Sequence, residues 1–277
     1  MTTLSHDSTI AFLGGGNMAA SLIGGLLSAG HAAENLRVAV RGAESVERLR
    51  LRFGVAATTQ LADCVAGAGI VVLAVKPQQA ADVLRGLQLA PGTVLISVAA
   101  GLRIETLRRW LGAAPTIVRA MPNTPALFGA GVTGAYLPPE APATAKAQAD
   151  ALLRTAGATC WVEREELIDA VTALSGSGPA YYFLLTEILA EAGVSLGLDA
   201  ATAEQLARLT FTGAATMLSE TGIDAATLRA QVTSKGGTTE AAVAALESAD
   251  LRRIFQTALV AAVDRARLRG DELAALA

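Results

Sequence analysis

The sequence has few of the side chains that enzymes commonly use for acid–base, metal or redox chemistry. Among 277 residues there are two cysteines and two histidines, and charged residues make up 17%. Cys64 and Cys160 lie far apart, without the close spacing of metal ligands, so we expect no metal site and two reduced, unreactive thiols. His6 and His31 belong to no motif. We expect both histidines at the surface, and we do not expect a histidine general acid.

The sequence also lacks the marks of membrane, exported and nucleic-acid-binding proteins. No stretch approaches the roughly 18 consecutive apolar residues of a membrane helix, and the N-terminus has neither the basic nor the apolar segment of a secretory signal. A net charge of −3 provides no basic surface for a polynucleotide. With 52% hydrophobic residues, the chain has the material for a core. We therefore expect a folded cytoplasmic protein without membrane or nucleic-acid partners.

Short apolar runs alternate with helix-like stretches over residues 1–163, the pattern of βαβ units around a parallel sheet. The expected strands are Thr9–Leu13, Leu36–Val40, Gly69–Val75, Thr93–Val98, Thr116–Met121, Val132–Leu137 and Ala158–Val162. Several are continuous runs of Val, Ile, Leu and Ala, which is typical of strands covered on both faces. The sequence thus predicts an α/β fold whose N-terminal domain is a doubly wound, mostly parallel Rossmann sheet.

Residues 164–277 have a different texture, with long alanine-rich amphipathic stretches and few β-branched clusters. The expected helices are Pro179–Leu196, Ala200–Glu220, Asp224–Gln231, Thr238–Glu247 and Asp250–Arg269. This pattern predicts an all-α C-terminal domain. Because small alanine faces let helices approach closely, the pattern is consistent with at least a dimer.

A glycine turn follows the first expected strand and opens an apolar helix; residues 14–19 read GGGNMA, a G-x-G-x-x-A pattern. In that context the first glycine makes the tight turn, the second lets the backbone approach a pyrophosphate, and the helix N–H groups solvate the phosphates. The alternative is a glycine-rich turn without a ligand. The predicted cofactor-binding residues here are Gly14, Gly15, Gly16, Asn17 and Met18.

The second expected strand ends near Arg41, at a position where NAD-binding proteins carry an acidic residue that accepts hydrogen bonds from the ribose. A guanidinium instead suits the 2′-phosphate of NADP, because it is permanently charged and donates in pairs. Arg41 therefore predicts a preference for NADPH over NADH. NADH stays open as a cofactor, and an ordinary solvated arginine stays open as an interpretation.

Two further segments follow strands at the carboxyl edge, where open α/β sheets bind ligands. One is AVKPQ at residues 74–78, and the other is RAMPNTP at residues 119–125, in which two prolines make a stiff loop. This loop is expected to border the nicotinamide. The predicted cofactor contacts in the two segments are Ala74, Val75, Lys76, Met121, Asn123 and Thr124.

A second anion site is predicted in the helical part, where VTSKGGTTE at residues 232–240 leads into an alanine-rich helix. Its two glycines permit close backbone approach, the first amides of the helix have no intrahelical acceptor, and the neighbouring side chains add hydroxyls and one positive charge. An ordinary capped loop is the alternative. The residues predicted to bind substrate are Gly236, Gly237, Thr238 and Thr239, beside Ser234 and Lys235.

The scarcity of proton donors bears on the reaction. The only lysines are Lys76, Lys146 and Lys235, so the expected long helix from Pro179 carries none. Hydride transfer to a ketone usually needs a strong proton donor for the developing alkoxide. An imine is protonated before it accepts hydride, so orientation and a hydrogen-bond partner for nitrogen suffice. A hydroxyl such as that of Thr239 meets this need.

The sequence resembles the pyrroline-5-carboxylate reductase family, NAD(P)H enzymes that complete proline synthesis, over almost the whole chain. The resemblance rests on the blocks Phe12–Ala19, Ala74–Gln78, Arg119–Pro125, Leu174–Tyr181 and Ser234–Thr239. It implies a homodimer formed by the helical domain, and assembly into a decamer as in many members. It also implies that the last block binds the substrate carboxylate through backbone amides, with Thr239 near the pyrroline nitrogen. We predict Thr239 and Ser234 as the catalytic residues, which position the ring nitrogen.

Two other functions stay open. A 3-hydroxyacid dehydrogenase shares this two-domain plan, but it would carry a catalytic lysine on the long helix. A regulatory protein that binds NADP without turnover would not need a carboxylate site.

Overall fold

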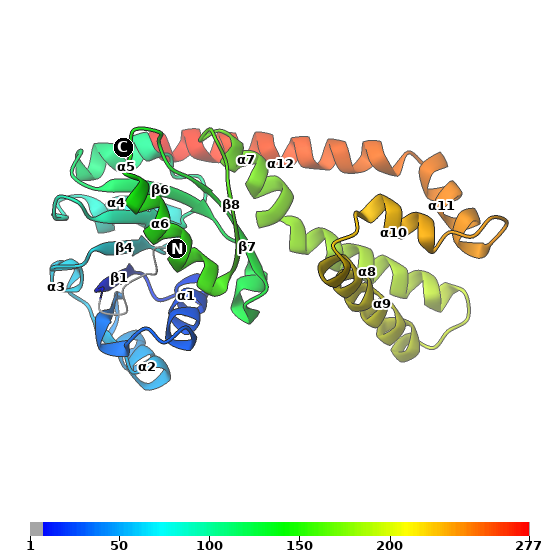
Figure 1. Ribbon diagram of the computed structural model, residues 1–277, viewed down its shortest axis with the longest axis horizontal. Coiled ribbons are helices and arrows are strands. Elements are labelled where there is room, and N and C mark those ends of the chain that lie inside the picture. Colours follow the sequence, from blue (N-terminus) through cyan, green and yellow to red (C-terminus); the bar gives the residue numbers. More distant parts are fainter. Residues whose placement is uncertain (1–7, 277) are drawn as a thin grey trace. The chain divides into compact units, whose positions relative to one another are not determined.

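The computed structural model describes residues 8–276, in which an eight-stranded sheet is followed by helices (Figure 1). The strands are β1 (Ile10–Leu13), β2 (Leu36–Ala39), β3 (Ala56–Thr58), β4 (Ile70–Leu73), β5 (Val94–Ser97), β6 (Thr116–Met121), β7 (Gly131–Tyr136) and β8 (Gly157–Trp161). Their order is β3-β2-β1-β4-β5-β6-β7-β8, and only the β6–β7 pair is antiparallel among these strands. The first six follow the doubly wound dinucleotide-binding order. The predicted fold class is confirmed.

All seven expected strands are present, with ends within two residues of the prediction. The strand that the sequence did not reveal is β3, which is three residues long and lies at the sheet edge. Its sequence, Ala-Ala-Thr, is too short to form an apolar run, so it is fixed by its pairing with β2 rather than by a local pattern.

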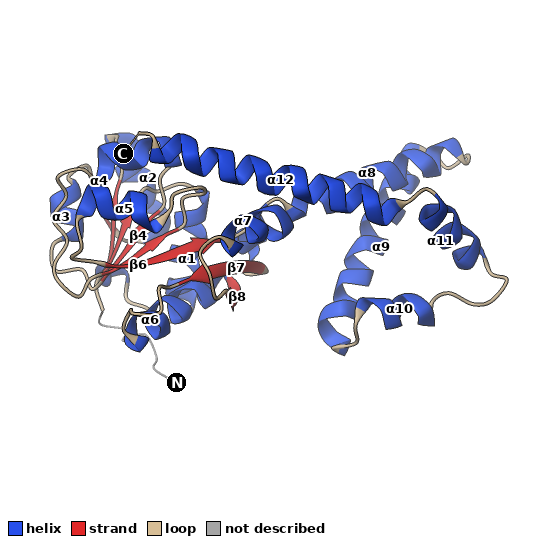
Figure 2. Cartoon of the chain, turned by 90° about the horizontal axis from the view of Figure 1, so that it is seen from above, coloured by secondary structure: helices blue, strands red, loops and turns tan. Residues whose placement is uncertain are grey.

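Helices cover both faces of the sheet (Figure 2). They are α1 (Asn17–Ser28), α2 (Ala43–Phe53), α3 (Leu61–Val65), α4 (Ala80–Leu84), α5 (Ile104–Leu111) and α6 (Ala143–Leu153). One apolar cluster joins the sheet to α1 and α6, and the other joins it to α3, α4 and α5. Alternate strand residues such as Phe12 and Leu13 therefore enter different clusters, and both are fully buried. This is why the strands read as continuous apolar runs.

The remaining chain is helical, as predicted. Its elements are α7 (Leu167–Val171), a π-helical turn (Thr172–Gly176), α8 (Gly178–Ser195), α9 (Ala200–Thr221), α10 (Ala225–Gln231), α11 (Thr238–Ser248) and α12 (Leu251–Ala274). By packing, the chain forms one unit up to Ser177 together with residues from Ala261 onward, and a second unit, Gly178–Val260. This grouping differs from the expected boundary between residues 163 and 164.

The C-terminal part of α12 belongs to the sheet unit through both apolar and ionic contacts. Leu273 is buried in the cluster that contains α5. Arg103, which precedes α5, pairs with Asp271 at 2.7 Å. These contacts place the last helical turns of the chain against the sheet domain, although they are far from it in sequence.

One expectation about a single side chain is wrong. His31 is only 4% exposed rather than lying on the surface, and its Nε2 is 2.9 Å from the carbonyl oxygen of Ser8. The turn after α1 thus brings the ring beside Ser8, which precedes β1. The predicted position of His6 lies outside the described residues. Between residues 8 and 276, none of the helices has the length and apolar character needed to span a membrane.

Candidate active site

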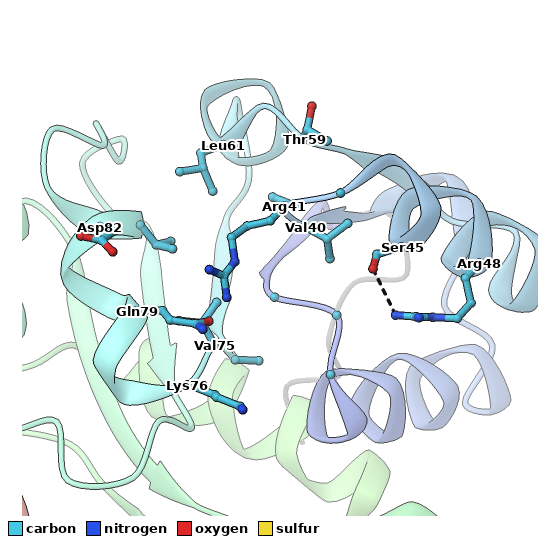
Figure 3. Close-up of a pocket in the computed structure, with 17 residues that line it drawn as sticks. Val40, Arg41, Ser45, Arg48, Thr59, Leu61, Val75, Lys76, Gln79 and Asp82 are labelled. Atoms are coloured by element: carbon cyan, nitrogen blue, oxygen red, sulfur yellow. Dashed lines mark hydrogen bonds between the residues drawn. The ribbon is translucent and has the colours of Figure 1, made fainter.

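A pocket of about 520 Å³ opens at the carboxyl ends of β1, β2 and β4 (Figure 3). The predicted cofactor residues that line it are Gly14, Gly15, Gly16, Arg41, Ala74, Val75 and Lys76. Those that do not line it are Asn17, Met18, Met121, Asn123 and Thr124. Other polar residues that line it and were not predicted are Ser45, Arg48, Thr59, Gln79 and Asp82. The pocket brings three segments together at one sheet edge, as the βαβ pattern requires.

Gly14 and Gly16 of the glycine turn have different surroundings. Gly14 has φ +105°, and a Cβ atom there would lie 2.6 Å from the carbonyl oxygen of Ala74, so no other residue fits the turn. Around a Cβ built on Gly16, in contrast, no described atom lies within 4 Å. The chain thus packs closely at Gly14 and leaves open space at Gly16. That space fits a pyrophosphate approaching the backbone.

Helix α1 presents its N-terminus to the same space. Gly16 is the N-cap residue and has no side chain to accept from the first turn. The N–H groups of Asn17 and Met18 have no intrahelical acceptor because they lie in that first turn. Together with the positive end of the helix dipole, these donors suit phosphate oxygens. The residues present therefore fit the pyrophosphate of a dinucleotide.

The pocket carries more positive than negative charge. Arg41, Arg48 and Lys76 line it, against one carboxylate, Asp82. Arg41 reaches from the end of β2 across the pocket toward Gln79 (Figure 3). On the α2 side, Arg48 donates to the Ser45 hydroxyl at 3.3 Å. No sequence motif marks Arg48, whose place depends on how α2 packs.

The loop after β6 lies outside this pocket lining, and its side chains contact the segment that leads to α8. The Asn123 Oδ1 atom accepts a hydrogen bond from the Val132 N–H at 3.0 Å, and its Nδ2 donates to the Ser175 hydroxyl at 3.4 Å. Asn123 is 9% exposed. Its contact with a cofactor therefore stays a prediction.

The predicted anion loop lies in the second unit and ends at the N-terminus of α11. Gly236 has φ +72°, and Gly237 is the N-cap residue of α11. A Cβ atom on Gly237 would lie 2.5 Å from the Ser234 Oγ atom, so a larger residue there would make the Ser234 side chain rotate away. The Gly236 N–H donates to the Glu240 carboxylate at 2.7 Å. This amide therefore already holds a carboxylate, one supplied by the chain itself.

The role of Glu240 was not predicted, although its spacing offered a signal. Glu at the third helical position commonly reaches back to the amides at the helix start, as in a capping box. Because Glu240 is the third residue of α11, it occupies that position. The side chain is exposed, so it competes with solvent and with any bound anion for the same donor.

The fold and the pocket define a dinucleotide-binding protein with a helical second part. Two known domain families match the chain: "NADP oxidoreductase coenzyme F420-dependent" at residues 9–101 and "Pyrroline-5-carboxylate reductase dimerisation" at residues 165–268. A pyrroline-5-carboxylate reductase of Pseudomonas aeruginosa is 42% identical over 95% of this chain and 97% of its own length. One from Corynebacterium melassecola is 41% identical over 95% of this chain and 99% of its own.

Solved structures agree with the sequence matches. A pyrroline-5-carboxylate reductase from Coxiella burnetii superposes with a TM-score of 0.87 at 41% identity, covering 95% of this chain and 98% of that one. A Plasmodium falciparum pyrroline carboxylate reductase with NADP bound gives a TM-score of 0.82 at 27% identity, covering 96% and 99%. The chain belongs to the pyrroline-5-carboxylate reductase family.

Proposed function

We propose that the protein reduces 1-pyrroline-5-carboxylate to L-proline with NADPH, the last step of proline biosynthesis. The observation that carries the proposal is the contact of the Gly236 N–H with the carboxylate of Glu240, which supports carboxylate binding at this amide. The same chain has a dinucleotide pocket. Relatives at about 40% identity bear the name of this activity. A biosynthetic reaction that consumes NADPH points to the cytoplasm as its location.

The cofactor would be held by the glycine turn, by Arg41 and by the loops after β4 and β6. Residues 14–18 hold the pyrophosphate, and Arg41 pairs with the 2′-phosphate. Ala74, Val75 and Lys76 on one side, and the loop Met121–Thr124 on the other, border the nicotinamide. When bound, the reduced nicotinamide supplies a hydride to the imine carbon.

The substrate would be held by the loop before α11. The amides of Gly236 and Thr238 bind its carboxylate, and Lys235 adds a nearby positive charge. The Gly237 N–H donates to the Ser234 carbonyl oxygen at 3.0 Å and so holds the turn that presents these amides. The hydroxyls of Ser234 and Thr239 hydrogen-bond the ring nitrogen and keep its proton in place. Because the protonated imine is already electrophilic, these residues act by orientation rather than by strong acid catalysis.

We also propose that two copies associate through the helices of the second unit. Most of the large apolar side chains that the described chain exposes lie in this unit, among them Tyr182, Phe183 and Leu189. Contiguous exposed apolar surface is a property of interfaces. The dimerisation family matched at residues 165–268 covers the same helices. Assembly of dimers into a decamer is the finer proposal.

The assay that tests the function follows NADPH oxidation with pyrroline-5-carboxylate, alongside NADP reduction with a 3-hydroxyacid. We expect turnover only of the imine. Turnover of the hydroxyacid alone would favour the dehydrogenase, and NADPH binding without any turnover would favour the regulatory protein. Thr239→Ala should lower kcat about tenfold, the cost of one hydrogen bond to a charged group, while the Kd for NADPH stays the same. An unchanged kcat would remove Thr239 from the mechanism.

A further inference from the structure

The π-helical turn at Thr172–Gly176 separates α7 from α8. Within it the Ser177 N–H donates to the Thr172 carbonyl oxygen, five residues back, at 2.8 Å. Such turns insert one extra residue into a helix. They are rare overall, and those that occur are often at functional sites. The first residue of the second unit, Gly178, follows directly. The turn therefore lies at the end of the sheet unit, just before this boundary.

Three alternate residues of β6 and its following loop contact α7 and this turn. They are Arg119, Met121 and Asn123, and alternate residues of an extended chain point to the same side. Asn123 lies beyond the strand but keeps extended backbone angles, with φ −125° and ψ 168°. The contact surface between the β6 strand with its loop and the α7–π-turn segment is called the seam below.

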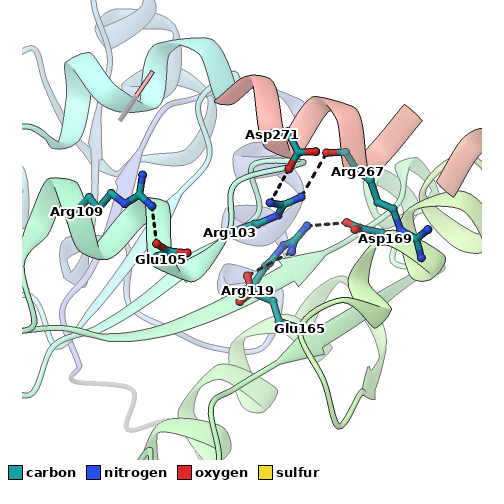
Figure 4. Close-up of polar contacts among 8 residues, drawn as sticks. All are labelled: Arg103, Glu105, Arg109, Arg119, Glu165, Asp169, Arg267 and Asp271. Atoms are coloured by element: carbon teal, nitrogen blue, oxygen red, sulfur yellow. Dashed lines mark hydrogen bonds and ion pairs between the residues drawn. The ribbon is translucent and has the colours of Figure 1, made fainter. Parts of the chain in front are cut away.

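At one end of the seam is a buried ionic group (Figure 4). The Arg119 guanidinium lies 3.1 Å from the Asp169 carboxylate and 3.3 Å from the Glu165 carboxylate, and its side chain is 4% exposed. The same Glu165 oxygen accepts from the Ile104 N–H at 2.8 Å. Removing a partner would leave a buried charge unpaired, which is costly. This group therefore holds α7 firmly to β6.

The middle of the seam is a steric contact. A Cβ atom on Gly176 would lie 2.5 Å from the Met121 Cε atom, so a larger residue there would make the flexible end of the Met121 side chain move. The neighbouring strand β7 approaches α7 in the same way, because a Cβ on Gly134 would lie 2.4 Å from Val171 Cγ1. Glycines thus allow both strands to approach the helical segment closely.

At the other end of the seam is the hydrogen bond from Asn123 to Ser175. The side-chain amide of Asn123 bridges the Val132 N–H and the Ser175 hydroxyl. Its oxygen and one of its N–H groups are thus engaged within the protein. A group that is already engaged on both sides is suited to holding the loop in place rather than to binding a ligand.

We infer that Asn123 and Ser175 form a positioning pair, which holds the Met121–Thr124 loop against the π-turn and so sets the position of that loop beside the nicotinamide. The inference rests on the proposed function, which places the loop at the nicotinamide. It assigns Asn123 an action through Ser175 instead of direct contact with the cofactor. In hydride transfer a misplacement of about 1 Å can cost up to about 100-fold in rate.

A double-mutant cycle with Asn123→Ala, Ser175→Ala and the combined variant tests the pair. We expect each single variant to lower kcat roughly tenfold, and Ser175→Ala to have no further effect in the Asn123→Ala background. The Kd for NADPH, measured by fluorescence without substrate, should stay within about twofold. Ser175→Thr keeps the hydroxyl and should retain most of the rate. Ser195→Ala, at the far end of α8, is the matched control, and thermal unfolding checks that each variant is folded.

Three results would overturn the inference. A large rise in the Kd for NADPH in Asn123→Ala, with Ser175→Ala unaffected, would make Asn123 a cofactor ligand. Effects on kcat that multiply in the combined variant would mean that the two side chains act independently. A wild-type protein that binds NADPH but does not reduce pyrroline-5-carboxylate would refute the proposed function, and the inference with it.

Discussion

Gly14 lies so close to Ala74 that a Cβ atom on Gly14 would be 2.6 Å from the Ala74 carbonyl oxygen. The backbone of Gly14 also has φ +105°, which side-chain-bearing residues rarely adopt. The turn that approaches the cofactor is therefore set by contact between β1 and the end of β4. Two residues further along, at Gly16, the space beside the backbone is open.

This difference predicts opposite results for two alanine substitutions. Gly14→Ala should lower the free energy of unfolding by about 2–3 kcal/mol, because the methyl group meets backbone and the φ value is strained. Gly16→Ala should leave stability unchanged but raise the Kd for NADPH roughly tenfold, because its methyl occupies the space for the pyrophosphate. Urea unfolding and fluorescence titration measure the two quantities. Equal effects of both variants on stability would contradict this account of the turn.

Arg41 should determine the choice between the two nicotinamide cofactors. Arg41→Asp places a carboxylate where the 2′-phosphate is expected, so the KM for NADPH should rise far more than the KM for NADH. Steady-state kinetics with both cofactors give the comparison. Arg52→Asp is the matched control, since Arg52 is an exposed arginine in the last turn of α2 that does not line the pocket. If the KM values for NADPH and NADH rose equally in Arg41→Asp, Arg41 would not bind the 2′-phosphate.

Glu240 should compete with the substrate for the Gly236 amide. Glu240→Gln removes the negative charge beside the Gly236 amide, where the substrate carboxylate is expected to bind. We predict that the KM for pyrroline-5-carboxylate falls roughly fivefold. The KM for NADPH should not change. Glu220→Gln, at the far end of α9, removes an equal charge as a control. A higher KM in Glu240→Gln would show that Glu240 supports the loop instead of blocking it.

The two cysteines should differ in reactivity. Burial raises the pKa of the Cys64 thiol to about 11, although nearby backbone hydrogen bonds and Arg37 oppose this. Cys64 thus stays a neutral thiol at pH 8, and the thiolate is the reactive form. Cys160 is exposed. Iodoacetamide at pH 8 should therefore modify Cys160 in the folded protein and both residues in urea, as peptide mass spectrometry would show. Fast modification of Cys64 in the folded protein would contradict this.

The same shift in the Cys64 pKa has a consequence for stability. The folded state holds the thiol proton more tightly than the unfolded state, so the contribution to stability is complete below the ordinary pKa of 9.0. It is lost as the pH rises from 9.0 toward about 11.

Most of the sheet could be predicted from the sequence because the strands are buried on both faces. Runs such as Ile70–Leu73 and Val94–Ser97 are almost entirely apolar, and the glycine turn follows β1 without interruption. The edge strand β3 and the burial of His31 could not be predicted, because pairing and chain reversal fix them. The π-helical turn has no local signature either, since it depends on one shifted backbone hydrogen bond.

The candidate site could be predicted where backbone geometry carries it and not where packing does. The glycines at residues 14–16 and 236–237 indicate from the sequence alone that a ligand or another segment comes close to the backbone there. In contrast, Arg48 enters the pocket only through the packing of α2, and Asn123 turns its amide to Ser175 rather than to the pocket. The return of α12 to the sheet unit also depends on tertiary contacts such as Arg103 with Asp271.

In the proposed mechanism, main-chain amides before α11 hold the substrate carboxylate while the glycine turn holds the dinucleotide. A crystal structure of the protein with NADP and L-proline would show both contacts at once. We expect proline carboxylate oxygens within hydrogen-bond distance of the amides of Gly236 and Thr238, the Glu240 side chain displaced, and the pyrophosphate at residues 14–18. A proline carboxylate bound elsewhere, with the Glu240 carboxylate still on the Gly236 amide, would contradict it.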